Sequence, residues 1–238
     1  MTNADRARAL TSELGLDRPP VALAFVNGAP EGVPSNSHVE PSACTFWRLA
    51  EERVFYVDAA GHQECPVGAM TMGFEVPPER QAGAEQFVGM MVDLQYLTMA
   101  EVAHLPSVKQ PHAGLLYGPL AEFPVEPAVV LAIATPRQAM LLAEASESVT
   151  LRESPALPTM GRPACAAVAW SANDGNVTLS LGCIGARTYV EVPDDQAVTV
   201  IPGNLLDTIA ERLTVMSRAN NELAAFHADR KREYAAAP

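Results

Sequence analysis

The sequence predicts a single compact domain of the α/β class, or of the related α+β class, built from two similar halves. Its length of 238 residues suits one large domain, and an apolar fraction of 48% can fill a sizeable core. Apolar runs of strand length alternate along the chain with segments of helical periodicity. A set of short motifs also occurs twice in the same order, and this repetition predicts the two halves.

A helix is expected at the start of the chain, because Ala7, Leu10 and Leu14 recur at spacings of three and four residues. Pro19 and Pro20 end this helix directly before an apolar run. The further elements expected before residue 105 are a strand at 21–26, a short helix at 44–50, a strand at 53–57, a helical turn within 63–72 and a helix at 84–104.

Strands and helices continue to alternate beyond residue 113. Asn173-Asp174-Gly175 is a strong signal for the turn of a two-stranded hairpin. The elements expected here are strands at 114–117 and 128–134, a helix at 136–146, hairpin strands at 164–170 and 176–181, a strand at 187–192 and a helix at 205–216. Residues 218–238 are expected to form a polar tail.

The two halves, at about 15–105 and 114–216, share an ordered series of motifs. Pro-Ser-Ala-Cys44 in the first half matches Pro-Ala-Cys165 in the second, and Cys65-Pro-Val-Gly-Ala matches Cys183-Ile-Gly-Ala. An apolar strand precedes each series and a helix follows it. Chance similarity between two segments of like composition is the alternative. If the halves are related, we expect them to pack about an approximate two-fold axis, with the cysteines forming two equivalent pairs.

Composition argues against several classes of function. The net charge of −12 leaves no basic patch for a nucleic acid or an anionic lipid surface. The longest apolar run, at 128–134, is far shorter than the ~20 residues that cross a bilayer. Charged residues near the N-terminus leave no room for a secretory signal, so we expect a cytoplasmic protein with reduced thiols. Motifs typical of phosphate-binding loops, zinc proteases and serine hydrolases do not occur in the sequence.

The four cysteines, Cys44, Cys65, Cys165 and Cys183, are the residues that point to a chemistry. A lone cysteine is often an inert core residue, and this stays the alternative for all four. Cysteines at or before helix starts favour the thiolate, because backbone N–H groups there lower the pKa of a thiol. Thiolates that converge in a protein interior require a compensating cation.

An iron–sulfur cluster, with the 4Fe-4S form favoured, is the metal group expected at the four cysteines. Zinc is less expected, because it commonly takes thiolates from pairs two to four residues apart and no such pair occurs here. A cluster accepts ligands from separate loops. Three cysteine ligands and an open iron would also suit a cluster that binds substrate, with the fourth cysteine structural.

Five further residues are candidates for such a site. Gly68 and Gly185 are candidate cofactor-binding residues, because glycine lets the backbone approach whatever the sulfurs bind. His62 is a candidate catalytic residue or ligand, with an exposed loop position as the alternative. Arg162 and Arg187 are candidates for neutralising an anionic cluster or a substrate carboxylate, Arg162 beside the cofactor and Arg187 in catalysis. The alternative for both arginines is a surface position.

The cysteine motifs together resemble the archaeal and bacterial family known as domain of unknown function 169, or ArCR. The resemblance extends from about Leu10 to Leu213 and is carried by Pro-Ser-Ala-Cys44-Thr-Phe-Trp, His62-Gln-Glu-Cys65-Pro-Val-Gly-Ala, Gly161-Arg-Pro-Ala-Cys165-Ala-Ala and Leu181-Gly-Cys183-Ile-Gly-Ala-Arg187. It implies a cytoplasmic, single-domain protein of prokaryotic type, and it supplies neither a substrate nor catalytic roles.

The sequence therefore predicts a cysteine-ligated iron–sulfur protein whose cluster acts as an electron carrier or a Lewis acid. If it is an enzyme, we expect a small anionic or sulfur-containing substrate at the cluster, and an electron-transfer partner. One alternative is a non-catalytic sensory protein that binds a metal or a small ligand. The other is a metal-free protein that binds a small molecule and has structural cysteines. Nucleic acids and membranes are not expected as partners, and a homodimer is expected only as a common state of cytoplasmic proteins.

Overall fold

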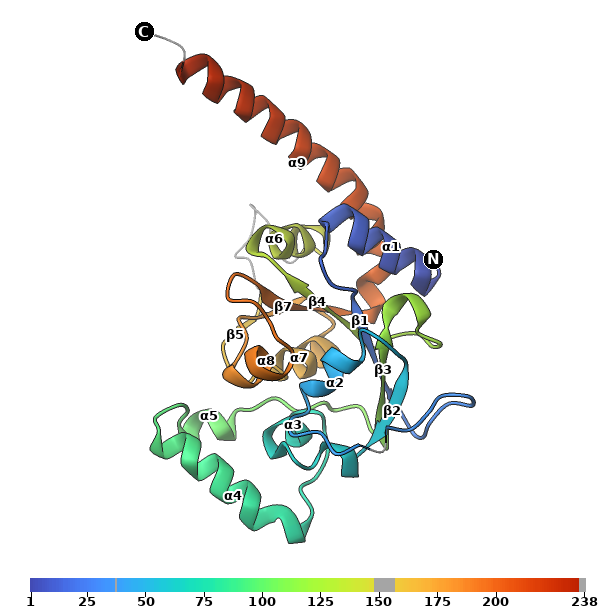
Figure 1. Ribbon diagram of the computed structural model, residues 1–238, viewed down its shortest axis with the longest axis vertical. Helices are drawn as coiled ribbons and strands as arrows, with labels where there is room; N and C mark the ends of the chain where they lie inside the picture. The colour runs from blue at the N-terminus through green and yellow to red at the C-terminus, as the bar shows by residue number, and fades with distance from the viewer. Residues whose placement is uncertain (37, 148–156, 236–238) are drawn as a thin grey trace.

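A seven-stranded mixed sheet runs through the domain and carries helices on both faces (Figure 1). The computed structural model describes residues 1–36, 38–147 and 157–235. The strands are β1 (Val21–Val26), β2 (Phe55–Asp58), β3 (Gly114–Pro119), β4 (Val129–Ala134), β5 (Thr159–Met160), β6 (Thr178–Ser180) and β7 (Ala197–Pro202). The α-helices are α1 (Asn3–Leu14), α2 (Thr45–Leu49), α3 (Pro66–Thr71), α4 (Pro78–Asp93), α5 (Met99–Ala103), α6 (Pro136–Ala145), α7 (Ala166–Asp174), α8 (Ile184–Tyr189) and α9 (Leu206–Ala235). The α/β class is thereby confirmed.

The middle of the sheet is the antiparallel pair of β1 and β4. The strand order is β2-β3-β1-β4-β7-β6-β5, and Val21 lies opposite Leu131 in the central pair. On one side β1 pairs with β3 and β3 with β2, and on the other β4 pairs with β7 and β7 with β6, all antiparallel. The short β5 pairs in parallel with β6. The first part of the chain therefore builds one side of the sheet and the second part the other.

The chain passes through the same order of elements twice. When α4, α5, α6 and β5 are left aside, the first part has the order β1, α2, β2, α3, β3 and the second the order β4, α7, β6, α8, β7. Because β3 pairs with β1 and β2, the sheet groups residues 114–119 with the first part, whereas the sequence had placed them in the second half. This order is what a duplication would produce. The approximate two-fold axis itself stays a prediction.

Strand β1 is buried on both faces, which explains its continuous apolar sequence. Its odd-numbered residues, such as Leu23, join a core cluster with residues of α2, α7 and α8. Its even-numbered residues, such as Ala22, join a second cluster with residues of α1, α6 and α9. These two sets of helices cover opposite faces of the sheet (Figure 1).

Two of the predicted strands are wrong, because they are helices. Helix α7 takes up most of the predicted strand 164–170, and α8 overlaps the predicted strand 187–192. Gly175, with a φ of 69°, ends α7 in the left-handed conformation and turns no hairpin. Asn-Asp-Gly suits both roles, because a helix end and a tight hairpin turn each require a positive φ.

The predicted helix at 84–104 consists of two helices, α4 and α5. Gln95, with a φ of 55°, lies between them and breaks the helical path. Helix α4 also begins earlier than predicted, at Pro78, and none of its residues is buried. The break creates a short loop at 94–98 that contains Tyr96.

Helix α9 joins the predicted helix at 205–216 to the predicted polar tail. It has 30 residues, its last buried residue is Ser217, and the remainder projects from the body of the molecule (Figure 1). Residues 148–156 of the predicted second half and 236–238 of the predicted tail lie outside the described residues. Within the described residues, no helix combines the length and the apolar character needed to span a membrane.

Shortening α9 tests which part of it supports the core. A chain that stops after Arg218 keeps every buried residue of α9, so its free energy of unfolding in urea should change by less than ~1 kcal/mol. A chain that stops after Asp207 also loses Ile209 and Leu213, which are fully buried. It should lose several kcal/mol or fail to fold, because removing one such side chain costs roughly 2–5 kcal/mol. A large loss in the first variant would show that the projecting part is packed in solution.

Candidate functional site

All four cysteines line one cavity of about 400 Å³ on the α2, α7 and α8 face of the sheet. Each cysteine directly precedes a helix: Cys44 precedes α2, Cys65 α3, Cys165 α7 and Cys183 α8. The two parts of the chain therefore contribute two helix starts each. Residues far apart in the sequence share this cavity because β1 and β4 place both parts side by side.

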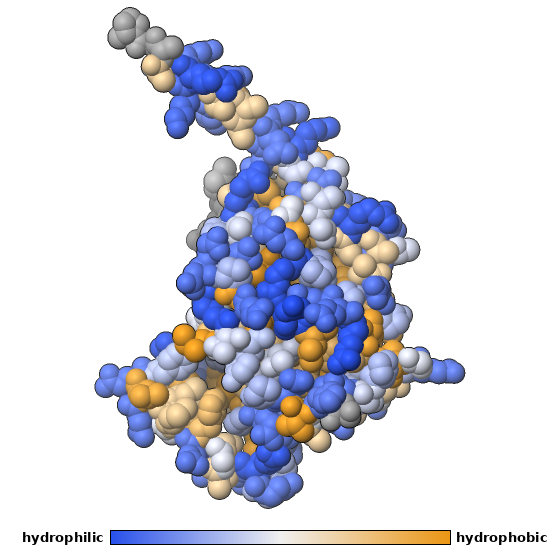
Figure 2. Space-filling view, in the orientation of Figure 1, coloured by the Kyte–Doolittle hydropathy of each residue, from blue (hydrophilic) through white to orange (hydrophobic). Residues whose placement is uncertain are grey.

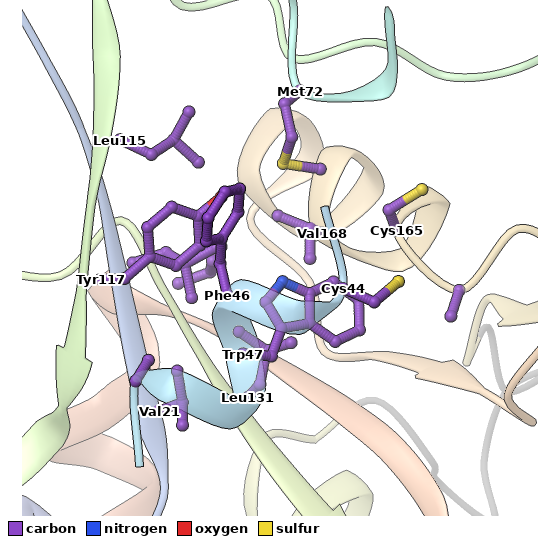
Figure 3. Packing of buried hydrophobic residues seen from close by; sticks show 14 of the residues in the cluster. Val21, Cys44, Phe46, Trp47, Met72, Leu115, Tyr117, Leu131, Cys165 and Val168 are labelled. Atoms are coloured by element: carbon purple, nitrogen blue, oxygen red, sulfur yellow. The ribbon is translucent and has the colours of Figure 1, made fainter. Parts of the chain in front are cut away.

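The thiols form an inner and an outer pair, and none is in a disulfide. Cys44 is 5% exposed and Cys165 4% exposed, whereas Cys65 and Cys183 are half-buried. Figure 3 shows the inner pair at the edge of the buried cluster, with both sulfur atoms pointing away from the ring of Phe46. The inner thiols thus belong to both the apolar core and the cavity.

The thiols of this cavity differ in their readiness to ionise. A hydrogen bond from the Cys44 thiol, which outweighs the effect of burial, lowers the pKa of Cys183 to about 5. Backbone N–H groups add to this effect, and that of Ala186 lies 3.5 Å from the Cys183 sulfur. The same hydrogen bond with Cys183, followed by burial, raises the pKa of Cys44. Burial is the first cause that raises the pKa of Cys165.

The two candidate glycines lie beside the sulfur atoms, as their positions in the motifs suggested. A Cβ atom at Gly68 would lie 2.7 Å from the Ala43 side chain and 3.0 Å from the Cys65 sulfur, so no larger residue fits there. A Cβ atom at Gly185 would have ordinary contacts, 3.8 Å from the Cys183 sulfur. Gly185 therefore serves the site through its backbone N–H, which helps to lower the pKa of Cys183.

Opposite the sulfur atoms, the cavity has an apolar wall from α4 and the loop that follows it. Phe87, Met90, Met91 and Leu97 line this wall, and Phe87 and Met90 are also 38% and 48% exposed to solvent. Orange and tan atoms gather over α4 and α5 in Figure 2. The sequence placed these residues within a predicted helix at 84–104, and it carried no signal that this segment would face the cysteines.

Arg162 lies at the cavity, as the sequence suggested, and it is the one basic residue among the described residues that line it. Its guanidinium group stacks on the ring of Tyr96, 4.3 Å from the ring centre. The hydroxyl of Tyr96 in turn accepts a hydrogen bond of 3.2 Å from the backbone N–H of Ile184. Tyr96 therefore joins the loop after α4 to the start of α8, and sequence reasoning missed it.

Arg187 lies outside the cavity lining, and its predicted catalytic role stays a prediction. Its guanidinium donates hydrogen bonds of 2.7 Å to the carbonyl oxygens of Leu181 and Pro193. These bonds hold the chain on both sides of the helix that Cys183 begins. Arg187 is therefore a positioning residue for the cysteine, because its N–H groups are directed at backbone oxygens.

His62 is a core residue, which corrects the exposed loop position considered for it, whereas its catalytic role stays a prediction. It is 1% exposed and does not line the cavity. Its Nδ1 lies 2.7 Å from the Asp58 carbonyl oxygen, which can only accept, so Nδ1 carries the proton. Its Nε2, 2.9 Å from the Tyr117 hydroxyl, then accepts a hydrogen bond. Burial lowers the pKa of His62 to about 4, so the ring is neutral near pH 7.

The fold and the site together define a class: an α/β protein with helices on both faces of its sheet and a cavity lined by the cysteines of two similar chain segments. The family of this chain is known. The family model for domain of unknown function 169, described as "Uncharacterised ArCR", matches residues 9–212, and the chain belongs to that family. The resemblance seen in the cysteine motifs is thereby confirmed. No curated protein and no solved structure matches the chain.

The burial of His62 predicts a loss of stability in acid. The unfolded chain takes up a proton near pH 6.5, whereas the folded protein does so only near its pKa of about 4. Folding should therefore lose up to ~3 kcal/mol from this residue as the pH falls through that range. His62→Gln should lose less between pH 7 and pH 4.5 in urea titrations, and the exposed His38→Gln should behave like the wild type. Equal losses in wild type and His62→Gln would contradict the assignment.

The ionisation of Cys183 can be measured on reduced protein treated with a chelator. Its alkylation by iodoacetamide, followed by mass spectrometry, should rise with a midpoint near pH 5, because the pKa is lowered to about 5. Cys44→Ala removes the main donor and should move the midpoint toward 9.0, the ordinary value. Cys65→Ala removes a thiol from the same cavity and should move it less. An unchanged midpoint in Cys44→Ala would show that Cys44 is not the donor.

Proposed function

We propose that the protein is an iron–sulfur protein and that Cys44, Cys65, Cys165 and Cys183 hold its cluster. The position of the thiols carries this proposal. The chain contains four cysteines, and all four line one cavity, each from the residue that precedes a helix. Packing in the core alone would not require all four cysteines to line the same cavity. The description of the family names no activity, so the proposal rests on this geometry.

Charge explains why a metal group would stabilise this arrangement. Cysteine binds metals as the thiolate, yet the pKa of Cys165 is raised by burial and that of Cys44 by its bond to Cys183 and by burial. Ionising these thiols without a nearby cation would be unfavourable. A metal group supplies the positive charge, and its binding energy then stabilises the folded chain.

The spread of the ligands favours a cluster over a single ion. Across residues 1–36, 38–147 and 157–235, no group of three or more His, Cys, Asp or Glu side chains is arranged to hold one metal ion. All four thiols line a cavity of about 400 Å³ instead. Thiolates hold a cluster of four iron and four sulfide ions from separate loops, which suits this arrangement better than a tetrahedral zinc site does.

The apolar wall supports a small-molecule ligand beside the cluster. In the enzyme form of the proposal, the cluster held by the four cysteines would supply electron-transfer or Lewis-acid chemistry to a small anionic or sulfur-containing substrate, and a partner would exchange electrons with it. The same wall favours a second candidate function, a metal-free protein that binds a small molecule and uses its cysteines for packing. Metal content separates the two candidates.

Iron, sulfide and the absorption spectrum, measured on protein purified without oxygen, test the proposal. Wild-type protein should contain both elements and absorb near about 400 nm. Cys44→Ser and Cys165→Ser should each lower the bound iron by roughly tenfold or more, because each removes a ligand. Thr188→Ala changes another residue of the cavity lining and should leave the iron content unchanged.

Unfolding in urea distinguishes loss of the metal from loss of the fold. Chelator-treated wild type and chelator-treated Cys44→Ser should have similar free energies of unfolding if the substitution acts on metal binding. Wild-type protein that contains neither iron nor sulfide would contradict the proposal and favour the metal-free candidate. Full iron content in both cysteine variants would also contradict it.

A further inference from the structure

A second opening meets the cysteine cavity at Arg162. An outer pocket of about 430 Å³ and the cysteine cavity share four lining residues, Tyr96, Arg162, Cys183 and Ile184. The outer pocket is open to solvent, and Gly161 and Gly182, which have no side chain, form part of its lining. A small molecule can therefore approach the Cys183 sulfur past Arg162.

The guanidinium group of Arg162 is held in place while its N–H groups stay accessible. Stacking on Tyr96 restrains the plane of the group, and the bond from Ile184 to the Tyr96 hydroxyl restrains the ring. The ion pairs within the described part of the chain involve other basic groups. Arg162 is thus an exposed cation, fixed by an aromatic ring and without a carboxylate partner at ion-pair distance among the described residues.

Glu101, a carboxylate that lines the outer pocket, is already hydrogen-bonded to another residue. Its carboxylate accepts hydrogen bonds of 2.6 Å and 2.9 Å from the backbone N–H and the hydroxyl of Thr98. These bonds first, and the charge of Arg162 more weakly, lower the pKa of Glu101. Glu64, on the opposite rim of the cysteine cavity, pairs with Arg80 at 2.5 Å. Neither carboxylate uses the N–H groups of Arg162.

A planar guanidinium group of this kind pairs best with a carboxylate, to which it can donate two parallel hydrogen bonds. The space beyond Arg162 is bounded by Phe87, Met90, Met91 and Leu97 on one side and by the thiols on the other. That space suits an apolar body and offers few partners to a second charge.

We propose that the site binds a small carboxylate with a short apolar body, its carboxylate group on Arg162 and its apolar body between α4 and the cysteines. The proposal deepens the iron–sulfur proposal and rests on it only for what the far end of the ligand meets, since the carboxylate contact itself needs no metal. Arg162 is the ligand-binding residue of this site. Tyr96 is a positioning residue that acts through it.

Hexanoate is a suitable probe, with hexan-1-ol as its uncharged counterpart and inorganic phosphate as an anion without an apolar body. Calorimetric titrations should use the full chain, both as purified without oxygen and after treatment with a chelator. Hexanoate should bind both forms roughly tenfold or more tightly than either counterpart. Equal affinity for hexan-1-ol or for phosphate would overturn the assigned class of ligand.

Variants then test the two residues. Arg162→Gln should weaken hexanoate binding by roughly tenfold to a hundredfold and leave hexan-1-ol binding unchanged, because it removes a charged donor. Arg162→Lys should restore part of the affinity, and Tyr96→Leu should lower it while Arg162 remains. Arg137→Gln, an exposed arginine on α6, is the matched control and should bind hexanoate like the wild type. Thermal unfolding of each variant should match the wild type.

The outcomes separate this inference from the iron–sulfur proposal. Hexanoate binding that depends on Arg162, in protein that already lacks iron when purified without oxygen, supports the carboxylate site and contradicts the cluster. Iron-containing protein that does not bind hexanoate, or binds it equally well after Arg162→Gln, overturns the carboxylate site and leaves the cluster standing.

Discussion

The antiparallel contact between β1 and β4 is the interaction on which the cysteine site depends. Each part of the chain carries two cysteines at helix starts, and the helices α2, α7 and α8 pack on the same face of the sheet. Because β1 and β4 are neighbours, the helix starts of both parts come together beside the middle of the sheet. A sheet in which the two parts were separated would leave two thiols in each and no common cavity.

The residues around this cavity differ in burial, and their roles differ accordingly. Cys44 and Cys165 are part of the core, so a charge on either must be balanced nearby. Cys183 lines the outer pocket beside Arg162. The bonds of Arg187 hold the backbone before and after the helix that Cys183 begins. Moving inward from solvent, a ligand thus meets a cation, then a thiol that ionises readily, and then the two buried thiols.

Much of the fold and the set of cysteines could be predicted from the sequence, because both depend on local patterns. Apolar runs predicted β1 and β4, and the repeated motifs singled out the four cysteines as one group of related residues. The predictions failed where a local pattern allows two structures. Asn-Asp-Gly ends α7 instead of turning a hairpin, since both uses need a positive φ at Gly175. The roles of His62 and Tyr96 depend on contacts with distant residues, such as Tyr117 and Arg162, and no spacing rule in the sequence reveals them.

The central claim is that the four thiols bind one inorganic cluster. Diffraction from crystals grown without oxygen, recorded on both sides of the iron absorption edge, tests it most directly. The account predicts anomalous density from several iron atoms within the cavity, in bonding contact with the sulfur atoms of the cysteines. A cavity without anomalous density, in which the thiols contact only one another or an organic molecule, would contradict it.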